Sequence, residues 1–388
     1  MLLFVAMLVG LPAFAPAQGL LPGEFSDIDL GRTLLEPGRF PTVKQLREAV
    51  REPKIRSVVM LKLHADGNNH FLPTWSHDGT RLAFQRSNLK QRASKVLLFP
   101  TLAQPKATVL DQGSAAYDHM FRWAQSSPAG YAFSRIDPES GSVHLMVSTD
   151  GGAPSPRTTG DGRHLMPALY ERTDGIWRMA YEKDGQVMLE AWRGDEVFDE
   201  PFALCRGTSP RWSASGGALL LARARGAKLG AFDIVMRVLP DKETQLSTSE
   251  VVRSPAWSPD ERFAAFFAKD AGDNKPWRIE VASLTGQAKA RPLVDEVVVN
   301  PSFDADEPTW EPSSRRVWCF SHRHRQQTYY PLVAVDVESG QQQVVDYPQR
   351  CTNPGDLAIN PKTFVPELVF VGHDGLPQDV YVLLLNHY

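Results

Sequence analysis

Short apolar runs separated by tight turns recur along the whole chain. The clearest example is 72–84, LPTWSHDGTRLAF, in which one run ends at Trp75 and a second begins at Leu82. The Asp78-Gly79 dipeptide between them favours a tight turn, because glycine accepts a positive φ and aspartate tolerates it. The pattern predicts two antiparallel β-strands joined as a hairpin.

The same hairpin recurs six more times at a nearly constant spacing. We call the residue that ends each first strand its anchor, and the anchors are Trp75, Trp123, Leu169, Trp212, Trp257, Trp310 and Ile359. Successive anchors are 43 to 53 residues apart. A repeat of this length, built from short strands, is typical of a β-propeller with four strands in each blade. The five tryptophan anchors are large flat side chains suited to packing between adjacent blades.

A second mark keeps the same period. Turn residues follow an apolar strand where the third and fourth strands of a blade would meet, at Gln104-Pro105, Asp150-Gly151-Gly152, Gly194-Asp195, Pro240-Asp241, Thr285-Gly286 and Ser339-Gly340. Because both marks stay in phase, we predict an all-β protein with a single β-propeller. The alternative is an unrelated series of hairpins packed as a sandwich.

The two ends of the propeller region predict how the ring of blades closes. The last repeat has a third strand, Val380–Leu385, but no fourth, while Arg56–His64 precedes the first hairpin and has no partner of its own. The sequence separation between Arg56–His64 and Trp75 is close to that between the fourth strand of one repeat and the anchor of the next. We therefore predict seven blades over residues 56–388, with the N-terminal strand completing the C-terminal blade, which removes the exposed edges of an open ring. Six blades with a spare hairpin is the alternative.

The residues before the propeller predict export. Residues 1–17 combine an apolar run of signal-peptide length with a small-x-small pattern at Ala15-Pro16-Ala17, and the run is short for a transmembrane helix. We expect a periplasmic or secreted protein whose mature chain has no transmembrane segment. Residues 18–55 form an expected tail with one short helix, Thr42–Glu52, that either binds a partner or packs on the propeller.

Composition narrows the classes of function. The 388 residues carry a net charge of −3 without a basic stripe, so nucleic-acid binding has no electrostatic support. Three cysteines allow at most one disulfide, and only Cys319 and Cys351 fall in the same repeat. Buried free thiols are the alternative.

The repeat P-x-W-S-x-D-G-x-x-x-A-F resembles that of TolB-type propellers, over residues 56–388. TolB is a periplasmic protein of the bacterial Tol–Pal system, and it carries an α/β domain before its propeller. Here about 38 residues separate the expected cleavage site from the first strand, so the resemblance implies a TolB-type repeat rather than TolB itself. The repeat is also similar to the blades of prolyl-oligopeptidase-like peptidases, whose G-x-S-x-G motif does not occur in this sequence.

A third resemblance, to the propeller of oligogalacturonate lyases, implies a divalent metal held by histidines near the central channel. Six of the ten histidines are expected on one face, formed by the loops that lead into first strands and the loops between second and third strands. The candidate binding residues are His70, His119 and His164 in the first kind of loop, and His322, Arg323, His324, Arg325 and His373 in the second. Imidazoles that converge can bind a divalent metal. A polar ligand face, or histidines that only cap strand ends, are the alternatives.

These observations favour a non-catalytic, exported propeller that binds another envelope or secreted protein through its loop face. No nucleophile motif, phosphate-binding loop, CxxC or HExxH occurs in the sequence, so no catalytic residue, metal ligand or cofactor is predicted. The competing hypothesis is a metal-assisted polysaccharide lyase, or a carbohydrate-binding propeller, that uses the histidine-rich face.

Overall fold

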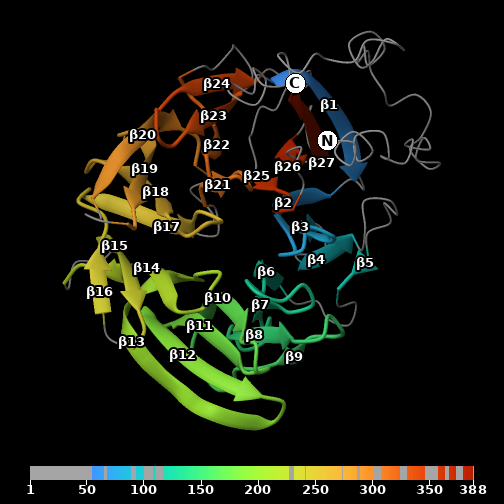
Figure 1. Ribbon diagram of the computed structural model, residues 1–388. Helices are drawn as coiled ribbons and strands as arrows, with labels where there is room; N and C mark the ends of the chain where they lie inside the picture. The colour runs from blue at the N-terminus through green and yellow to red at the C-terminus, as the bar shows by residue number, and fades with distance from the viewer. Residues whose placement is uncertain are drawn as a thin grey trace, which may run out of the picture.

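The computed structural model describes residues 55–64, 68–88, 93–99, 108–110, 117–226, 231–240, 242–272, 274–285, 289–299, 307–323, 330–345, 357–362, 367–372 and 379–387. In these residues every regular element is a β-strand, and the sheets follow one another around a ring (Figure 1). No helix in this part of the chain is long and apolar enough to cross a membrane. The expected signal peptide and the tail helix lie outside the described residues.

Each repeat forms a sheet whose first strand is innermost. The first two repeats contribute β2 (Asn69–Trp75), β3 (Leu82–Asn88), β4 (Ala93–Phe99) and β5 (Thr108–Val109), then β6 (Tyr117–Trp123), β7 (Tyr131–Ile136), β8 (Val143–Ser148) and β9 (Ser155–Pro156). The third and fourth share one long strand, in the order β10 (His164–Glu171), β11 (Trp177–Lys183), β12 (Gln186–Arg193), β13 (Glu196–Trp212), β14 (Ala218–Ala224), β15 (Phe232–Val238) and β16 (Lys242–Gln245).

The remaining repeats follow the same plan. The fifth and sixth are β17 (Val251–Trp257), β18 (Phe263–Lys269), β19 (Trp277–Ser283) and β20 (Ala290–Val297), then β21 (Thr309–Trp310), β22 (Arg316–Phe320), β23 (Leu332–Asp336) and β24 (Gln342–Val345). The last sheet has the order β1-β27-β26-β25, from β25 (Leu357–Ile359), β26 (Glu367–Gly372), β27 (Asp379–His387) and β1 (Ile55–His64).

The two ends of the propeller region therefore meet in one sheet. β1 pairs antiparallel with β27, with Met60 opposite Leu383, and Figure 1 shows the two strands side by side. The all-β class and the propeller of four-stranded sheets predicted from the repeat are confirmed. The number of blades and the closure of the ring remain predictions, and this pairing supports both.

A repeated β-bulge shapes the innermost strands. In five of them the residue three positions before the anchor has a positive φ of 51° to 57°, although none is glycine; these are Leu72, Met120, Met166, Ser209 and Ser254. The pairing register with the second strand shifts at the same place in each. A bulge re-aims the side chains that follow it. The conserved geometry from repeat to repeat thus sets the direction of the anchor and of the residue before it.

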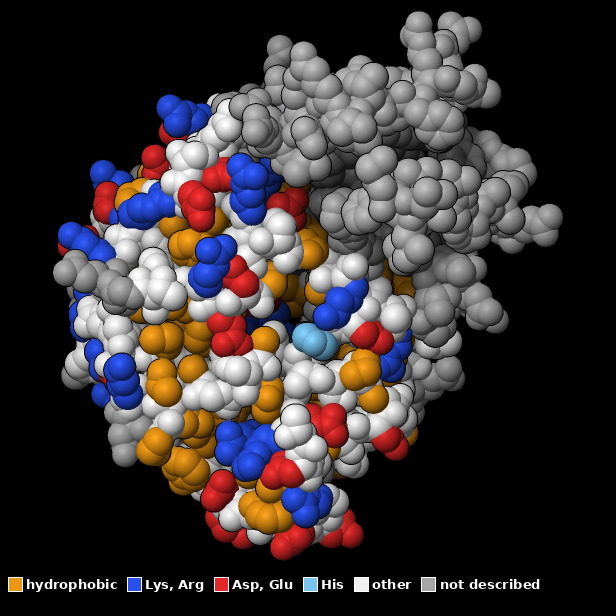
Figure 2. Space-filling view, viewed as in Figure 1, with side chains coloured by type: hydrophobic (Ala, Val, Ile, Leu, Met, Phe, Trp, Pro, Cys, Tyr) orange, Lys and Arg blue, Asp and Glu red, His pale blue; other side chains and the backbone are white. Residues whose placement is uncertain are grey.

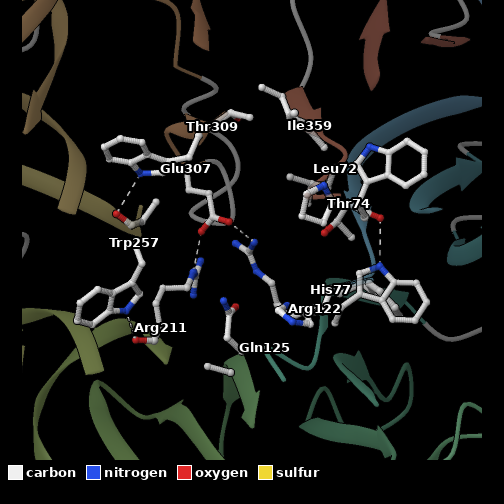
Figure 3. Close-up of a pocket in the computed structure, with 18 of the residues that line it drawn as sticks. Leu72, Thr74, His77, Arg122, Gln125, Arg211, Trp257, Glu307, Thr309 and Ile359 are labelled. Atoms are coloured by element: carbon white, nitrogen blue, oxygen red, sulfur yellow. Dashed lines mark hydrogen bonds and ion pairs between the residues drawn. The ribbon is translucent and has the colours of Figure 1, made fainter. Parts of the chain in front are cut away.

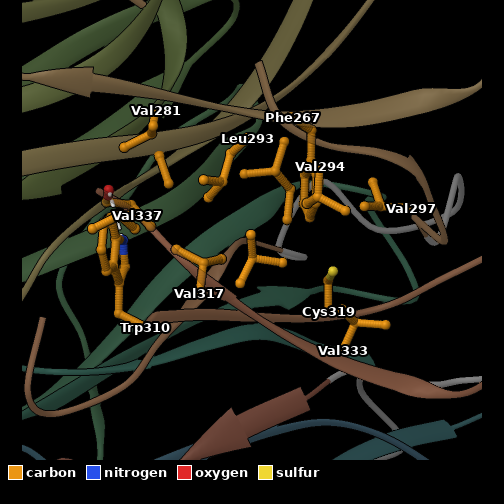
Figure 4. Close-up of a cluster of buried hydrophobic side chains, with 14 of the residues drawn as sticks. Phe267, Val281, Leu293, Val294, Val297, Trp310, Val317, Cys319, Val333 and Val337 are labelled. Atoms are coloured by element: carbon orange, nitrogen blue, oxygen red, sulfur yellow. Dashed lines mark hydrogen bonds between the residues drawn. The ribbon is translucent and has the colours of Figure 1, made fainter. Parts of the chain in front are cut away.

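The core lies between adjacent sheets. One cluster joins Phe267, Val281 and Leu293 of the fifth sheet to Trp310 and Val317 of the sixth, together with neighbouring valines and Cys319 (Figure 4). Cys319 is a buried free thiol, and its burial raises its pKa to about 12. Cys205 is also a free thiol. Cys351 lies outside the described residues.

Four tryptophan anchors also tie each sheet to the one before it. The indole Nε1 of Trp123 donates to the carbonyl of Thr74 at 3.1 Å, and that of Trp257 to Arg211 at 2.9 Å. Trp212 and Trp310 donate in the same way to Ala168 and Ala256, at 3.0 and 3.4 Å. In each case the acceptor is the residue just before the preceding anchor. These bonds fix the inner strands relative to one another.

Candidate functional site

A cavity of about 290 Å³ lies on the ring axis, and first-strand residues or the turns after them from all seven repeats line it. Figure 2 shows the molecule hollowed at the centre of this face, with basic side chains inside the hollow. The cavity reaches the turns that follow the first strands, where His77 and Gln125 line it (Figure 3). A cavity shared by every repeat is the natural candidate for a functional site of a ring.

The residue just before each anchor lines this cavity. The seven residues are Thr74, Arg122, Ala168, Arg211, Ala256, Thr309 and Ala358. Successive side chains of a strand point to opposite sides, so a residue next to an anchor that packs between sheets faces the axis. Five of the seven side chains are small, which leaves room at the axis, and two are arginine.

Both arginines reach the same carboxylate. Arg122 Nη1 donates to Glu307 Oε1 at 2.8 Å, and Arg211 Nε donates to Glu307 Oε2 at 2.7 Å (Figure 3). Glu307 precedes β21, Arg122 is in β6, and Arg211 is in β13, so three repeats far apart in sequence meet here. The Glu307 side chain keeps 30% of its surface accessible because it borders the cavity, although protein surrounds it on the other sides.

The ion pairs shift the pKa values of the groups they join. Burial alone raises the pKa of Glu307, but the charges of Arg122 and Arg211 and their hydrogen bonds outweigh it and hold the pKa below its usual value. Burial, together with the charge of Arg122, lowers the pKa of Arg211 to about 10 despite the opposing effect of Glu307. Glu307 and Arg211 are therefore both charged at neutral pH.

The cavity carries an excess of positive charge. Arg122, Arg211 and Glu307 are the charged side chains among the described residues that line it. His77 also lines it, but burial and the charge of Lys362 lower its pKa, so it adds no charge at neutral pH. In the described structure Arg211 Nη2 is buried without a hydrogen-bond partner. One carboxylate thus faces two guanidinium groups, and the net charge of the lining is +1.

The expected histidine face is not this site. His70, His119 and His164 lie within β2, β6 and β10 rather than in the loops before them, so their placement in loops was wrong. His70 and His164 are buried, at 0% and 2% exposure. The first strands start earlier than the apolar pattern indicated, because each continues across its bulge. All three histidines lie at the start of their strands, whereas the cavity extends from the bulge to the strand ends.

The second histidine group is only partly described. His322 and Arg323 are exposed after β22, and the His322 ring packs edge-on against Tyr330 with a centroid distance of 4.8 Å. His324, Arg325 and His373 lie outside the described residues. Neither His322 nor Arg323 lines the cavity.

A metal site of the kind expected from the lyase resemblance is not formed by the described residues. Among them, no group of three His, Cys, Asp or Glu side chains is arranged to hold a metal ion. The His164 ring stacks on His144 at a centroid distance of 6.3 Å, and its Nδ1 lies 2.8 Å from the Val143 carbonyl oxygen. These contacts explain His164 as a packed side chain of the interior.

Sequence reasoning missed Arg122 and Arg211, although a signal for them existed. Aligned on the anchors, the preceding residue reads Thr, Arg, Ala, Arg, Ala, Thr, Ala, so two long charged side chains interrupt a column of small ones. The strand period places that column on one side of the inner strands. We treated the anchors only as packing residues, so we did not predict that this column of preceding residues faces the axis.

Comparison with solved structures finds other propellers. Oligogalacturonate lyase in complex with manganese matches over 84% of this chain and 93% of its own, with a TM-score of 0.55 and 11% identity. The β-propeller domain of Cps50 (Swd1) from Myceliophteria thermophila matches over 85% of this chain and 99% of its own, with a TM-score of 0.51 and 12% identity. The chain has a β-propeller fold. TolB from Acinetobacter baumannii matches over 71% of this chain and 65% of its own, with a TM-score of 0.48 and 12% identity.

At these identities the likeness shows the fold alone. Comparison with known protein families and with curated proteins finds no match for the chain. The function of this propeller therefore has to be argued from its own residues.

His119 should make the stability of the folded protein depend on pH. Burial, with a smaller contribution from the charge of Arg163, lowers the pKa of His119 to about 4, so the folded protein holds it neutral below the usual histidine pKa. The unfolded chain takes up a proton near pH 6.5. The stability from neutral His119 is complete above that pH and is lost as the pH falls toward 4. We expect a loss of about 2 kcal/mol between pH 7.5 and 5.

Urea unfolding at a series of pH values measures this effect. The loss should shrink by about 2 kcal/mol in His119→Gln, whereas His322→Gln, which changes an exposed histidine, should keep the wild-type dependence. Equal pH dependence in wild type and His119→Gln would contradict the assignment.

Proposed function

We propose that this protein is an exported, non-catalytic β-propeller that binds another envelope or secreted protein, and that the partner places a carboxylate in the central cavity. The observation that carries the proposal is the net positive charge of a cavity lined by all seven repeats. Export rests on the signal-peptide pattern of residues 1–17.

The electrostatics of the cavity suit an acidic group. Two guanidinium groups offer more N–H donors than one carboxylate can accept, and arginine binds carboxylates well because its donors are planar and fixed. A narrow cavity with protein walls strengthens the attraction between opposite charges relative to open solvent. An acidic side chain or chain end of a partner therefore fits better than a neutral or basic one.

The rigidity of the ring supports binding at the cavity. Indole–carbonyl bonds join neighbouring inner strands, so the residues before the anchors keep their relative positions. A preorganised site loses less freedom on binding. The charged residues of the lining are already paired with one another.

A short acidic peptide tests the chemistry of the cavity. We expect acetyl-Gly-Glu-Gly-Glu-amide to bind in calorimetry at low salt, and acetyl-Gly-Gln-Gly-Gln-amide to bind at least tenfold more weakly. Arg122→Gln keeps the Arg211–Glu307 pair but removes the excess charge, so it should weaken acidic-peptide binding at least tenfold. Arg262→Gln, an exposed control outside the lining, should leave binding unchanged. Equal affinity for both peptides would exclude the acidic-group proposal.

A crosslinking experiment tests the protein partner separately. A photoreactive residue at His77, on the cavity lining, should crosslink to one protein in the periplasmic or secreted fraction, and Arg122→Gln should abolish the crosslink. The same residue at Glu139, an exposed position in the turn between β7 and β8, is the control. Crosslinking equal to that control would exclude a partner at the cavity, and finding the protein only in the cytosol would exclude export.

A further inference from the structure

The hairpin formed by β12 and β13 exposes an unusual outer strand. All eight residues of its outer segment, 196–203, are exposed. Among the described residues, Val197, Phe198 and Phe202 are three of the five exposed large hydrophobic side chains, at 44%, 43% and 47% exposure. Three large apolar side chains within six residues form a concentrated patch, which usually marks an interaction site.

One edge of this segment is open. Its pairing runs from Arg193 opposite Glu196 to Gln186 opposite Arg206, always with β12, and β14 begins to pair only at Gly207. No other strand of the described chain pairs with 196–203. Figure 1 shows the hairpin reaching away from the centre of the ring. Its outer edge therefore presents backbone C=O groups and, except at Pro201, N–H groups to solvent, although the register with β12 shifts twice opposite residues 197–202.

Five other outer strands, β5, β9, β16, β20 and β24, do not share this combination. β5 and β9 have two residues each, while β16 and β24 have four. β20 is as long as the exposed segment, but three of its eight residues are buried. Short outer strands give little edge for another chain to pair with. Compared with these five strands, the third repeat has a longer, more exposed and partly aromatic edge.

The charges on the hairpin select the kind of partner. Asp195, Glu196, Asp199 and Glu200 surround the apolar residues, while Arg193 lies 5.2 Å from the centre of the Phe198 ring. The segment 193–203 carries four acidic side chains against one basic side chain. Figure 2 shows acidic and hydrophobic side chains together at this end of the molecule. A second copy pairing edge to edge would bring carboxylates against carboxylates, which is unfavourable.

We propose that the outer edge of β13 binds an extended, basic polypeptide segment by strand addition. The partner's backbone would pair with residues 196–203, its lysines or arginines would meet the four carboxylates, and its apolar residues would contact Phe198 and Phe202. Strand addition takes affinity from main-chain hydrogen bonds and specificity from alternate side chains. This surface is separate from the central cavity, and its partner has the opposite charge.

A labelled peptide of five Lys-Val repeats tests the proposal by fluorescence anisotropy at low salt. We expect it to bind the full-length protein, and a peptide of five Glu-Val repeats to bind at least tenfold more weakly. The Lys-Val peptide with alternate backbone nitrogens methylated cannot complete the ladder, so it should also bind at least tenfold more weakly. Failure of the Lys-Val peptide to bind, or binding of either other peptide as tightly as the Lys-Val peptide, would overturn the proposal.

Variants locate the site. Phe198→Ser combined with Phe202→Ser, and separately Glu196→Lys combined with Glu200→Lys, should each weaken Lys-Val peptide binding at least tenfold. Val344→Ser changes an equally exposed side chain on β24 and should have no effect. Arg122→Gln should also have no effect, which separates this site from the cavity. Binding that the hairpin variants leave unchanged, or a dimer in sedimentation that depends on Phe198, would overturn a basic partner at this edge.

Discussion

Trp212→Ala is expected to lower the free energy of unfolding by about 3 to 5 kcal/mol, as for other large aromatic side chains removed from a core. Trp212 is 3% exposed and packs against Tyr170, with a ring-centroid distance of 6.0 Å. Its indole also donates to Ala168 in the preceding inner strand. The substitution therefore leaves a cavity between two sheets and removes one of the bonds that tie them.

Two phenylalanine variants separate the hydrogen bond from the packing. Trp212→Phe keeps an aromatic ring but removes the donor to the Ala168 carbonyl, and should cost about 1 to 3 kcal/mol. Trp75→Phe is the matched control, because in the described structure Trp75 Nε1 is buried without a hydrogen-bond partner. Urea unfolding followed by circular dichroism measures the free energy of unfolding of Trp212→Ala, Trp212→Phe and Trp75→Phe. A Trp75→Phe loss as large as that of Trp212→Phe would mean that the indole–carbonyl bond does not stabilise the ring.

Glu307→Ala is expected to cost about 2 to 3 kcal/mol of stability and, at the same time, to tighten binding of the acidic peptide. Removing one partner of a buried ion pair typically costs 3 to 5 kcal/mol, and the contact of Glu307 with the cavity reduces this value. The two arginines are then left close together without their shared carboxylate. The net charge of the cavity lining rises from +1 to +2. An acidic ligand is therefore attracted more strongly to the cavity.

The opposite signs of the two effects make the Glu307 experiment informative. A general disruption of the site would lower stability and binding together. Unfolding and calorimetry should be measured on the same preparation, with Glu311→Ala as the control, a carboxylate beside Trp310 that is absent from the cavity lining. Weaker peptide binding in Glu307→Ala would show that Glu307 itself contacts the ligand, against the proposed role of the net charge.

The two proposed surfaces give the protein contacts of opposite charge. The cavity lies on the ring axis and carries a net positive charge, whereas the β12–β13 hairpin lies at the outer edge and is acidic. Binding at the cavity and binding at the hairpin can therefore be told apart by varying the salt concentration and the charge of the ligand. Surface electrostatic contacts weaken as ionic strength rises, while contacts in a protein-walled cavity are screened less. Peptide binding to the hairpin should be the more salt-sensitive of the two.

By itself the sequence determined the repeat, because each local signal needs only a few neighbouring residues. An apolar run, an Asp-Gly turn and a second apolar run specify a hairpin wherever they occur, and a spacing of 43 to 53 residues between anchors specifies a ring of similar sheets. Three of the predicted turns between third and fourth strands are found where the pattern placed them: Asp150-Gly151-Gly152 between β8 and β9, Gly194-Asp195 between β12 and β13, and Ser339-Gly340 between β23 and β24. Gln104-Pro105, Asp241 and Gly286 lie outside the described residues.

Only the tertiary structure decided which residues meet at the axis. Arg122 and Glu307 are 185 positions apart, and Arg211 lies 96 positions from Glu307. Bulges precede Arg122 and Arg211 in β6 and β13, and the arrangement of the sheets around the ring brings both arginines to Glu307. The histidines were misplaced for the same reason, since a bulged strand does not show the simple alternation that marks its start. Local sequence patterns determine the strands and turns, but which side chains line the central cavity depends on contacts between distant repeats.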